Sequence, residues 1–313
     1  MIVMAEDGVR IRVLQPGLGD PVLLIPDWLS SGMFFEALTP SLEARGLCPL
    51  RYDPRGSGRS DRPEYGYSLT RDAEDAALVA EAVVGQGVFV AGHGYGARVA
   101  LRLSMLRPDL VRGLILMAPS VTGSRMETWH NAIEDERWLS DLLVTSMSRP
   151  IPPQDTAMLA RDMAHTTRSA GLVRLRAMAE EVGALPASVA IGVVAGEFDG
   201  WTPIGMVRRT FQDRAGDRWR LMAASGHYLA WEDPDALAEA IEAMMHPAPP
   251  EPAVREDETG SVILVEPPPD DLEPADTANG LLEEEAEPVW PWEPESPGPE
   301  DAAAPDPPPS DGR

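Results

Sequence analysis

The chain has 313 residues, a formal net charge of −25 at pH 7 and 43% hydrophobic residues. An acidic balance repels nucleic acid and anionic membrane surfaces, so neither is expected as a partner. Cys48 is the only cysteine, which excludes an intrachain disulfide and a cysteine metal cluster. No apolar run reaches 18 residues and the start lacks a signal-peptide pattern, so a cytoplasmic location outside the membrane is expected.

The composition changes near residue 246. Residues 247–313 hold 17 of the 32 prolines and 19 acidic residues against two arginines, so this segment carries most of the net charge. Such a segment cannot bury enough apolar surface to offset chain entropy, and we predict a disordered acidic, Pro-rich tail. Its apolar spots, 281–282 and 289–292, either dock on a protein partner or belong to an inert solubilising tail. Residues 1–246 are long enough for one α/β domain.

Short apolar runs alternate with helical patterns along residues 1–246. Continuous apolar strands separated by helices predict a mostly parallel sheet with helices on both faces. Two later helices are predicted to start at Thr202-Pro203 and Asp233-Pro234, where an N-cap residue precedes a proline at the first helical position. The strands are predicted at residues 9–14, 21–25, 48–53, 88–92, 111–119, 189–196 and 218–225.

Residues 122–185 interrupt this alternation with helical patterns and no convincing strand. An insertion at this point would lie above the carboxyl ends of the strands, where open α/β sheets bind ligands. Several large apolar side chains of the insertion either line an apolar pocket or form the inner faces of packed helices. They are Met126, Trp129, Trp138, Met147, Met158, Met163 and Met178.

Four stretches carry a family resemblance: LLIPDW, YDPRGSGRSDRP, AGHGYGA, and the pair GEFDGWTP with ASGHYLAWEDP. In this order they resemble the α/β-hydrolase superfamily, in the subgroup of single-domain esterases, lactonases and C–C hydrolases with a helical cap. The resemblance covers about residues 8–245. It implies an eight-stranded, mostly parallel sheet with a helical cap, and no cofactor.

AGHGYGA is similar to the turn on which the family carries its nucleophile, a strained turn between a strand and a helix. Gly92 and Gly96 match the small flanking positions, but Gly94 occupies the position of the nucleophile itself. Glycine adopts the strained conformation easily and offers no oxygen or sulfur for attack. An acyl-enzyme therefore cannot form at Gly94.

The resemblance also implies two partners of a catalytic triad. Asp199 follows the expected strand at 189–196, where the family has its acid, and His227 follows the expected strand at 218–225, where it has its base. A carboxylate bonded to one imidazole nitrogen fixes the tautomer and raises the basicity of the other nitrogen. We predict a His227–Asp199 dyad.

The family's oxyanion turn reads Pro26-Asp27-Trp28 here, in place of its usual His-Gly. The backbone N–H groups of Trp28 and Tyr95 are the expected oxyanion donors. Asp27, however, would place a negative charge where negative charge develops, unless its side chain faces away or is paired. This departure, like Gly94, opposes ordinary ester hydrolysis.

Other residues receive lesser roles. Arg55 and Asp53 of YDPRGSGRSDRP are expected to tie loops together, and His93 to pack or hydrogen-bond beside the turn. No spacing of His, Asp and Glu indicates a metal site. Relocated nucleophiles remain conceivable and are not persuasive; they are Ser30, Ser31, Cys48 and Ser225.

Three functions remain open. The leading one is a pseudoenzyme that binds a small apolar molecule under the cap, or a protein partner. The alternative is an enzyme that uses His227–Asp199 as a general base for proton abstraction or water activation, with assistance on the order of 10²–10⁴. The third is a conventional ester hydrolase with a relocated nucleophile.

Overall fold

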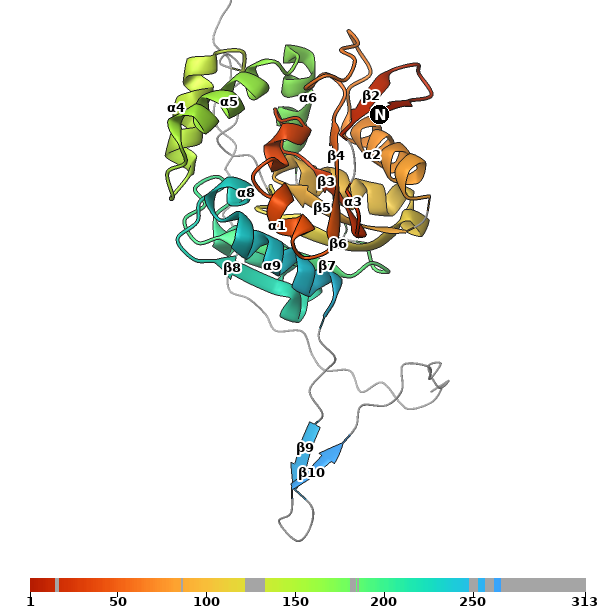
Figure 1. Cartoon of the computed structure of the whole chain (residues 1–313), viewed down its shortest axis with the longest axis vertical. Coiled ribbons are helices and arrows are strands. Elements are labelled where there is room, and N and C mark those ends of the chain that lie inside the picture. The colour runs from red at the N-terminus through yellow and green to blue at the C-terminus, as the bar shows by residue number, and fades with distance from the viewer. Residues whose placement is uncertain are drawn as a thin grey trace, which may run out of the picture. The chain divides into compact units, whose positions relative to one another are not determined.

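The computed structural model describes residues 1–14, 17–85, 87–121, 133–180, 184, 186–247, 253–256 and 262–265 (Figure 1). It divides into two units, Met1–Pro249 and Pro250–Arg313, and each is described by itself.

The first unit is built on an eight-stranded sheet with the order β1-β2-β4-β3-β5-β6-β7-β8. The six strands β4, β3, β5, β6, β7 and β8 pair in parallel with their neighbours. At one edge of the sheet, β1 pairs antiparallel with β2, and β2 pairs antiparallel with β4. The predicted α/β-hydrolase sheet is confirmed, although β1 was not among the runs expected from the sequence. The bounds are β1 Ile2–Met4, β2 Arg10–Val13, β3 Asp20–Ile25, β4 Leu47–Asp53, β5 Val88–His93, β6 Val111–Met117, β7 Ile191–Gly196 and β8 Trp219–Met222.

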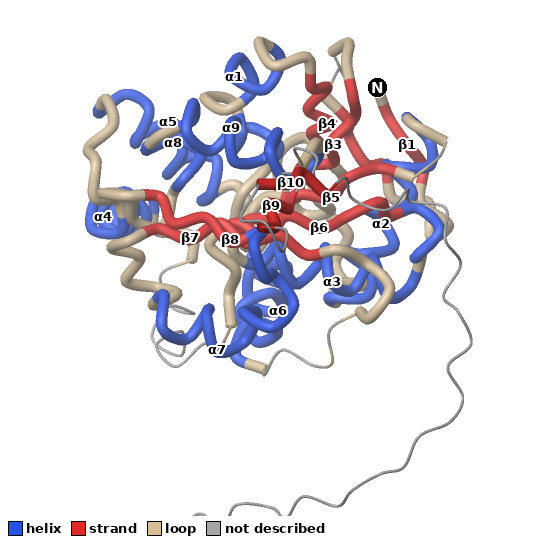
Figure 2. The backbone as a smooth tube through the Cα atoms, turned by 90° about the horizontal axis from the view of Figure 1, so that it is seen from below, coloured by secondary structure: helices blue, strands red, loops and turns tan. Residues whose placement is uncertain are grey.

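Helices cover both faces of this sheet, which explains why β7 is buried along its whole length and reads as a continuous apolar run. α1 and α9 lie on one side of the strands, and α3 and α7 lie on the other (Figure 2). The bounds are α1 Thr39–Glu43, α2 Leu69–Val83, α3 Tyr95–Leu106, α7 Ile204–Ala215, α8 Leu229–Glu232 and α9 Pro234–Met245, with short 3₁₀ turns η1 Gly32–Phe35, η2 Pro108–Leu110 and η4 Gly216–Arg218.

Three further helices follow β6 and precede β7, inside the predicted insertion. They are α4 Glu136–Ser146, α5 Pro153–Ala164 and α6 Arg168–Ala179, which gather at the top of Figure 1. We call them the cap helices. Met163 and Met178 are buried in the core, Trp138 and Met147 pack against it half-buried, and Met158 is half-buried. Met126 and Trp129 lie outside the described residues.

The two predicted helix starts have different outcomes. Asp233 is the N-cap of α9, accepts a hydrogen bond from Ala236 N, and precedes Pro234 at the first position, as predicted. The prediction for Thr202 is wrong by one residue, because Pro203 is the N-cap of α7. The Thr202 hydroxyl instead donates to the carboxylate of Asp199.

The second unit contains two short strands, β9 Ala253–Glu256 and β10 Val262–Val265, which pair antiparallel. The sequence-based expectation of a disordered tail did not include them. Their runs AVRE and VILV contain the β-branched residues that favour strands. Residues 248–252, 257–261 and 266–313 of the predicted tail, including both apolar spots, lie outside the described residues.

Candidate functional site: a carboxylate in the place of the nucleophile

The sharp turn between β5 and α3 places Gly94 at the carboxyl end of the sheet. Its backbone has φ 53° and ψ −112°, a left-handed conformation that side chains rarely adopt. The strand and helix approach so closely here that a Cβ at Gly92 would overlap the backbone of Gly96. The turn therefore has the geometry of a nucleophile-bearing turn, with no side chain at its centre.

The space beside Gly94 is filled by Asp27, which lies in the turn after β3. β3 pairs with β5 so that Ile25 lies opposite Gly92, and this register brings the two turns together. A Cβ at Gly94 would overlap all three atoms of the Asp27 carboxyl group. Asp27 is 3% exposed. The carboxylate of one loop thus occupies the volume that a side chain on the other would take.

One oxygen of Asp27 lies between the two predicted oxyanion donors. Trp28 N and Tyr95 N each donate a hydrogen bond to Asp27 Oδ1, at 2.8 Å in both cases. These N–H groups converge on one point, as an oxyanion hole requires. That point already holds a negatively charged oxygen of the protein itself.

His227 and Asp199 form a close, buried pair. The distance between His227 Nδ1 and Asp199 Oδ2 is 2.9 Å, and both side chains are 1% exposed. Asp199 Oδ1 also accepts from Trp201 N and Thr202 N at 2.8 and 3.0 Å. Burial alone would raise the pKa of Asp199, but His227 and the hydrogen bonds from Thr202 lower it to about 2. The predicted dyad residues lie within hydrogen-bonding distance of one another.

The second nitrogen of His227 faces Asp27 instead of a nucleophile. His227 Nε2 lies 3.1 Å from Asp27 Oδ2. Burial lowers the pKa of His227, but the carboxylates of Asp199 and Asp27 outweigh it and raise that pKa to about 10. Burial likewise opposes ionisation of Asp27, yet His227 and His93 hold the pKa of that carboxyl below its ordinary range. At neutral pH, His227 is an imidazolium between two carboxylates.

His93, the last residue of β5, lies beside Asp27 and His227. Its Nε2 lies 2.8 Å from the carbonyl oxygen of His227, and its Nδ1 lies 3.7 Å from Asp27 Oδ2. Nδ1 is buried and has no hydrogen-bond partner among the residues that the structure describes. One nitrogen or oxygen atom from each of Asp27, His93 and His227 lies within 4.8 Å of the others. Positions so far apart in the chain show no spacing pattern, so this group could not be predicted from the sequence.

A buried arginine of the cap helices fastens the loops around the site. Arg174 of α6 pairs with Asp72 of α2 at 2.9 Å and donates to the carbonyl oxygens of Arg55 and Trp28 at 2.9 and 3.4 Å. It also donates to Ser57 Oγ at 3.0 Å. The backbone beside Asp27 is thereby held from the cap side.

The loop after β4 braces the same region through ion pairs. Arg55 is fully buried and makes hydrogen bonds of 2.6 and 2.8 Å to the two carboxylate oxygens of Asp75. It also contacts Asp7 at 2.8 Å. Asp53 accepts a hydrogen bond from Gly32 N at 3.0 Å. These contacts tie separate loops together, which is the structural role that the sequence predicts for Arg55 and Asp53.

Three of the four conceivable replacement nucleophiles have other contacts. Ser31 Oγ donates to Asp162 at 2.8 Å, and Ser225 Oγ donates to the carbonyl of Ala223. Cys48 Sγ donates to the carbonyl of Gly17, and burial raises the pKa of its thiol. The carboxylate of Asp27 is the group that faces His227 Nε2.

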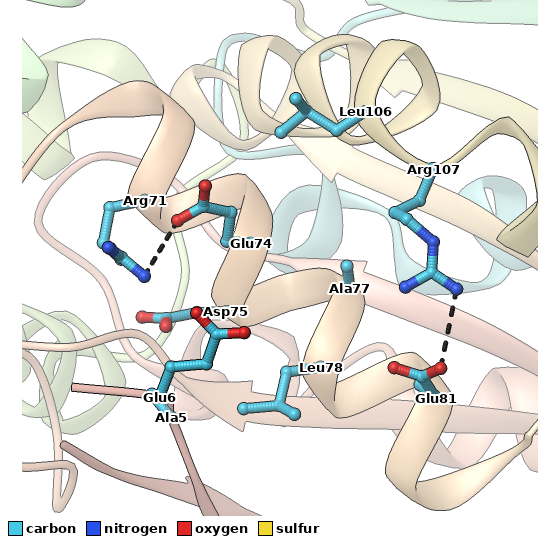
Figure 3. A pocket seen from close by; sticks show the side chains of 10 residues that line it. All are labelled: Ala5, Glu6, Arg71, Glu74, Asp75, Ala77, Leu78, Glu81, Leu106 and Arg107. Atoms are coloured by element: carbon cyan, nitrogen blue, oxygen red, sulfur yellow. Dashed lines mark ion pairs between the residues drawn. The ribbon is translucent and has the colours of Figure 1, made fainter. Parts of the chain in front are cut away.

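Two cavities are lined by described residues. The one that Asp27 and Arg174 help to line does not include His227 or Gly94, and its volume of about 10 Å³ is room for about one water molecule. A larger cavity of about 320 Å³ lies between the N-terminal strand region, α2 and α3 (Figure 3). Its charged rim includes the ion pairs Arg71–Glu74 and Arg107–Glu81, and it contains none of the predicted site residues.

The fold agrees with a comparison with known families. The sequence model described as "Alpha/beta hydrolase family" matches residues 22–240. The chain belongs to the alpha/beta hydrolase family. This match includes both turns of the site, the cap helices and the dyad, and it ends before the acidic segment.

Individual relatives in this family share shorter stretches. A 2-(acetamidomethylene)succinate hydrolase of Mesorhizobium japonicum is 33% identical over 108 residues, which is 34% of this chain and 38% of that protein. The AB hydrolase superfamily protein YisY of Bacillus subtilis is 30% identical over 100 residues, covering 32% and 37%. The aligned stretches thus span less than two fifths of these relatives.

The fold is shared with solved alpha/beta hydrolases. An esterase from Exiguobacterium antarcticum superposes with a TM-score of 0.66 at 20% identity, covering 77% of this chain and 97% of the esterase. In the described part of the chain, no helix is long and apolar enough to span a membrane.

Proposed function

We propose that this chain is a non-hydrolytic, cytoplasmic member of the alpha/beta hydrolase family that acts by binding a partner. The observation that carries the proposal is the position of Asp27. Its carboxylate takes the volume of the missing side chain at Gly94 and occupies both oxyanion donors. Ester hydrolysis needs a nucleophile at position 94, and it needs the N–H groups of Trp28 and Tyr95 to be free to bind the oxyanion.

Electrostatics support the same proposal. A tetrahedral intermediate places negative charge at the oxyanion donors, and removing one donor costs about 10²–10³ in turnover. Here Trp28 N and Tyr95 N already donate to the charged Asp27 Oδ1. A substrate carbonyl would have to displace a buried carboxylate and then develop charge beside it.

The alternative is an enzyme that uses the His227–Asp199 dyad as a general base. The 2.9 Å contact between the two side chains favours it. A general base must be unprotonated at its working pH, whereas the pKa of His227 is raised to about 10 by the two flanking carboxylates. Proton abstraction by His227 would therefore require Asp27 to move away first. The conventional hydrolase with a relocated nucleophile has less support, because Ser31, Ser225 and Cys48 make the other contacts described above.

We favour a protein partner over a small apolar ligand. Among the cavities lined by described residues, the one that Asp27 lines is about 10 Å³, far below the hundreds of Å³ that a small-molecule pocket needs. The acidic segment 247–313 adds a negatively charged region that complements a basic partner.

Two measurements together test the proposal: the turnover of esters and lactones, and the capture of a protein partner by the full chain. We expect the native chain to hydrolyse activated aryl esters and lactones no faster than His227→Gln, while a basic protein partner is retained by the full chain. A version that ends at residue 246 separates partners of the tail from partners of the body. Ester or lactone turnover that is lost in His227→Gln would overturn the proposal in favour of a working dyad.

A further inference from the structure

The group formed by Asp27, His93 and His227 has an unexplained feature at its centre. His93 Nε2 lies 2.8 Å from the carbonyl oxygen of His227, which directs the other ring nitrogen, Nδ1, toward Asp27 Oδ2, 3.7 Å away. Nδ1 is buried and makes no hydrogen bond to the residues that the structure describes. A buried polar atom without a partner costs free energy, and a cation between Nδ1 and Oδ2 would provide that partner.

We propose that Asp27, His93 and His227 form a binding site for a divalent transition-metal cation of the Zn²⁺ type. Two imidazoles and one carboxylate are a donor set that such cations favour. Zinc bonds of about 2.0–2.1 Å in a tetrahedral arrangement separate the donor atoms by about 3.4 Å. The observed separations are 3.1 Å from Asp27 Oδ2 to His227 Nε2 and 3.7 Å from Asp27 Oδ2 to His93 Nδ1.

Each of the three ligands is oriented by a second hydrogen bond, as ligands of protein-bound metals usually are. Asp199 holds His227 Nδ1 at 2.9 Å, which leaves Nε2 to face the cation. The His227 carbonyl oxygen holds His93 Nε2, which leaves Nδ1 to face it. Trp28 N and Tyr95 N donate hydrogen bonds to Asp27 Oδ1, which leaves Oδ2 to face the cation.

Burial also fits a cation better than a vacant cluster. The exposed fractions of Asp27, His93 and His227 are 3%, 0% and 1%. Asp27 and Asp199 bring two negative charges to this enclosed region. A bound cation would compensate these negative charges. It would also join the turn after β3, the end of β5 and the loop after β8.

The test uses the full chain after treatment with a chelator. Co²⁺ serves as a spectroscopic probe through its visible absorption, and Zn²⁺ is titrated by calorimetry, both with folded protein and with protein refolded in its presence. We expect one equivalent of metal and a higher melting temperature with Zn²⁺. His93→Gln, which removes one ligand, should weaken binding on the order of 100-fold or more.

His246→Gln is the matched control, since His246 is half-exposed and pairs with Asp20 away from this group; its metal affinity should equal that of the native chain. Circular dichroism checks that His93→Gln folds, and Asp27→Asn provides a second ligand variant. The proposal is overturned if the native chain takes up no stoichiometric metal, or if both ligand variants bind it as tightly as the native chain. Metal-dependent ester turnover would instead contradict the non-hydrolytic function and leave the metal site standing.

Discussion

The double substitution Asp27→Gly with Gly94→Ser is expected to create ester hydrolysis that neither single substitution creates. Gly94→Ser alone places its Cβ within the Asp27 carboxyl group, at a backbone φ of 53° that side chains rarely adopt. The double variant removes the overlap and frees Trp28 N and Tyr95 N for an oxyanion. Loss of a triad nucleophile costs about 10⁴–10⁶ in turnover, so a gain of at least about 10³-fold over Gly94→Ser is expected.

The measurement is p-nitrophenyl ester turnover of the native chain, both single variants, the double variant and the double variant with His227→Gln. The last of these should return to the background rate, because the new serine would lack its base. If Gly94→Ser alone matched the double variant, Asp27 would not occupy the oxyanion donors, and the site described here would be wrong.

Asp72→Ala is expected to lower the free energy of unfolding by about 3–5 kcal/mol, the range for breaking a buried ion pair from one side. Arg174 is 2% exposed and pairs with Asp72 at 2.9 Å. The substitution leaves its guanidinium buried without that carboxylate, and it also removes the acceptor of the Tyr95 hydroxyl, 3.0 Å away. Urea unfolding followed by circular dichroism measures the change.

Glu74→Ala on the same helix is the control for this prediction. Glu74 pairs with Arg71 at 2.9 Å, but its side chain is 45% exposed. Exposed pairs contribute about 0–1 kcal/mol, so this variant should stay close to the native chain. Equal losses in the two variants would show that the Arg174–Asp72 pair does not fasten the cap helices to the body.

The fold was accessible from the sequence because its signals are local and repeated. Runs such as IGVVAG are apolar throughout, as a strand covered on both faces must be, and β7 is Ile191–Gly196. The turn at Gly94 was recognisable from the small residues Gly92 and Gly96, which the close approach of strand and helix requires. The helix start at Asp233-Pro234 was predicted correctly from capping chemistry.

The site was only partly accessible, because its decisive contacts join positions that are distant in sequence. Gly94 and Asp27 were each visible as departures from the family pattern. Asp27 fills the space beside Gly94 because of the register between β3 and β5, and the sequence does not show this register. His93 was expected to pack or hydrogen-bond beside the turn, and its Nε2 does lie 2.8 Å from the His227 carbonyl oxygen, but nothing in its neighbours reveals that Nδ1 faces Asp27. The N-cap of α7 was predicted one residue too early, because the Thr202 hydroxyl donates to Asp199 and not to the start of the helix.

The Asp27 carboxylate lies beside Gly94 and faces His227 Nε2. A ¹⁵N nuclear magnetic resonance titration of the histidine ring nitrogens, in metal-free buffer, tests this contact most directly. Two flanking carboxylates should keep His227 protonated through neutral pH, with the transition near its raised pKa of about 10. Because the pKa of His227 is raised on folding, protonated His227 stabilises the folded chain. This contribution is complete below the unfolded pKa of about 6.5 and is lost as the pH rises through 10. Asp27→Asn should move the transition to lower pH. A native transition near 6.5, unchanged in Asp27→Asn, would contradict the account.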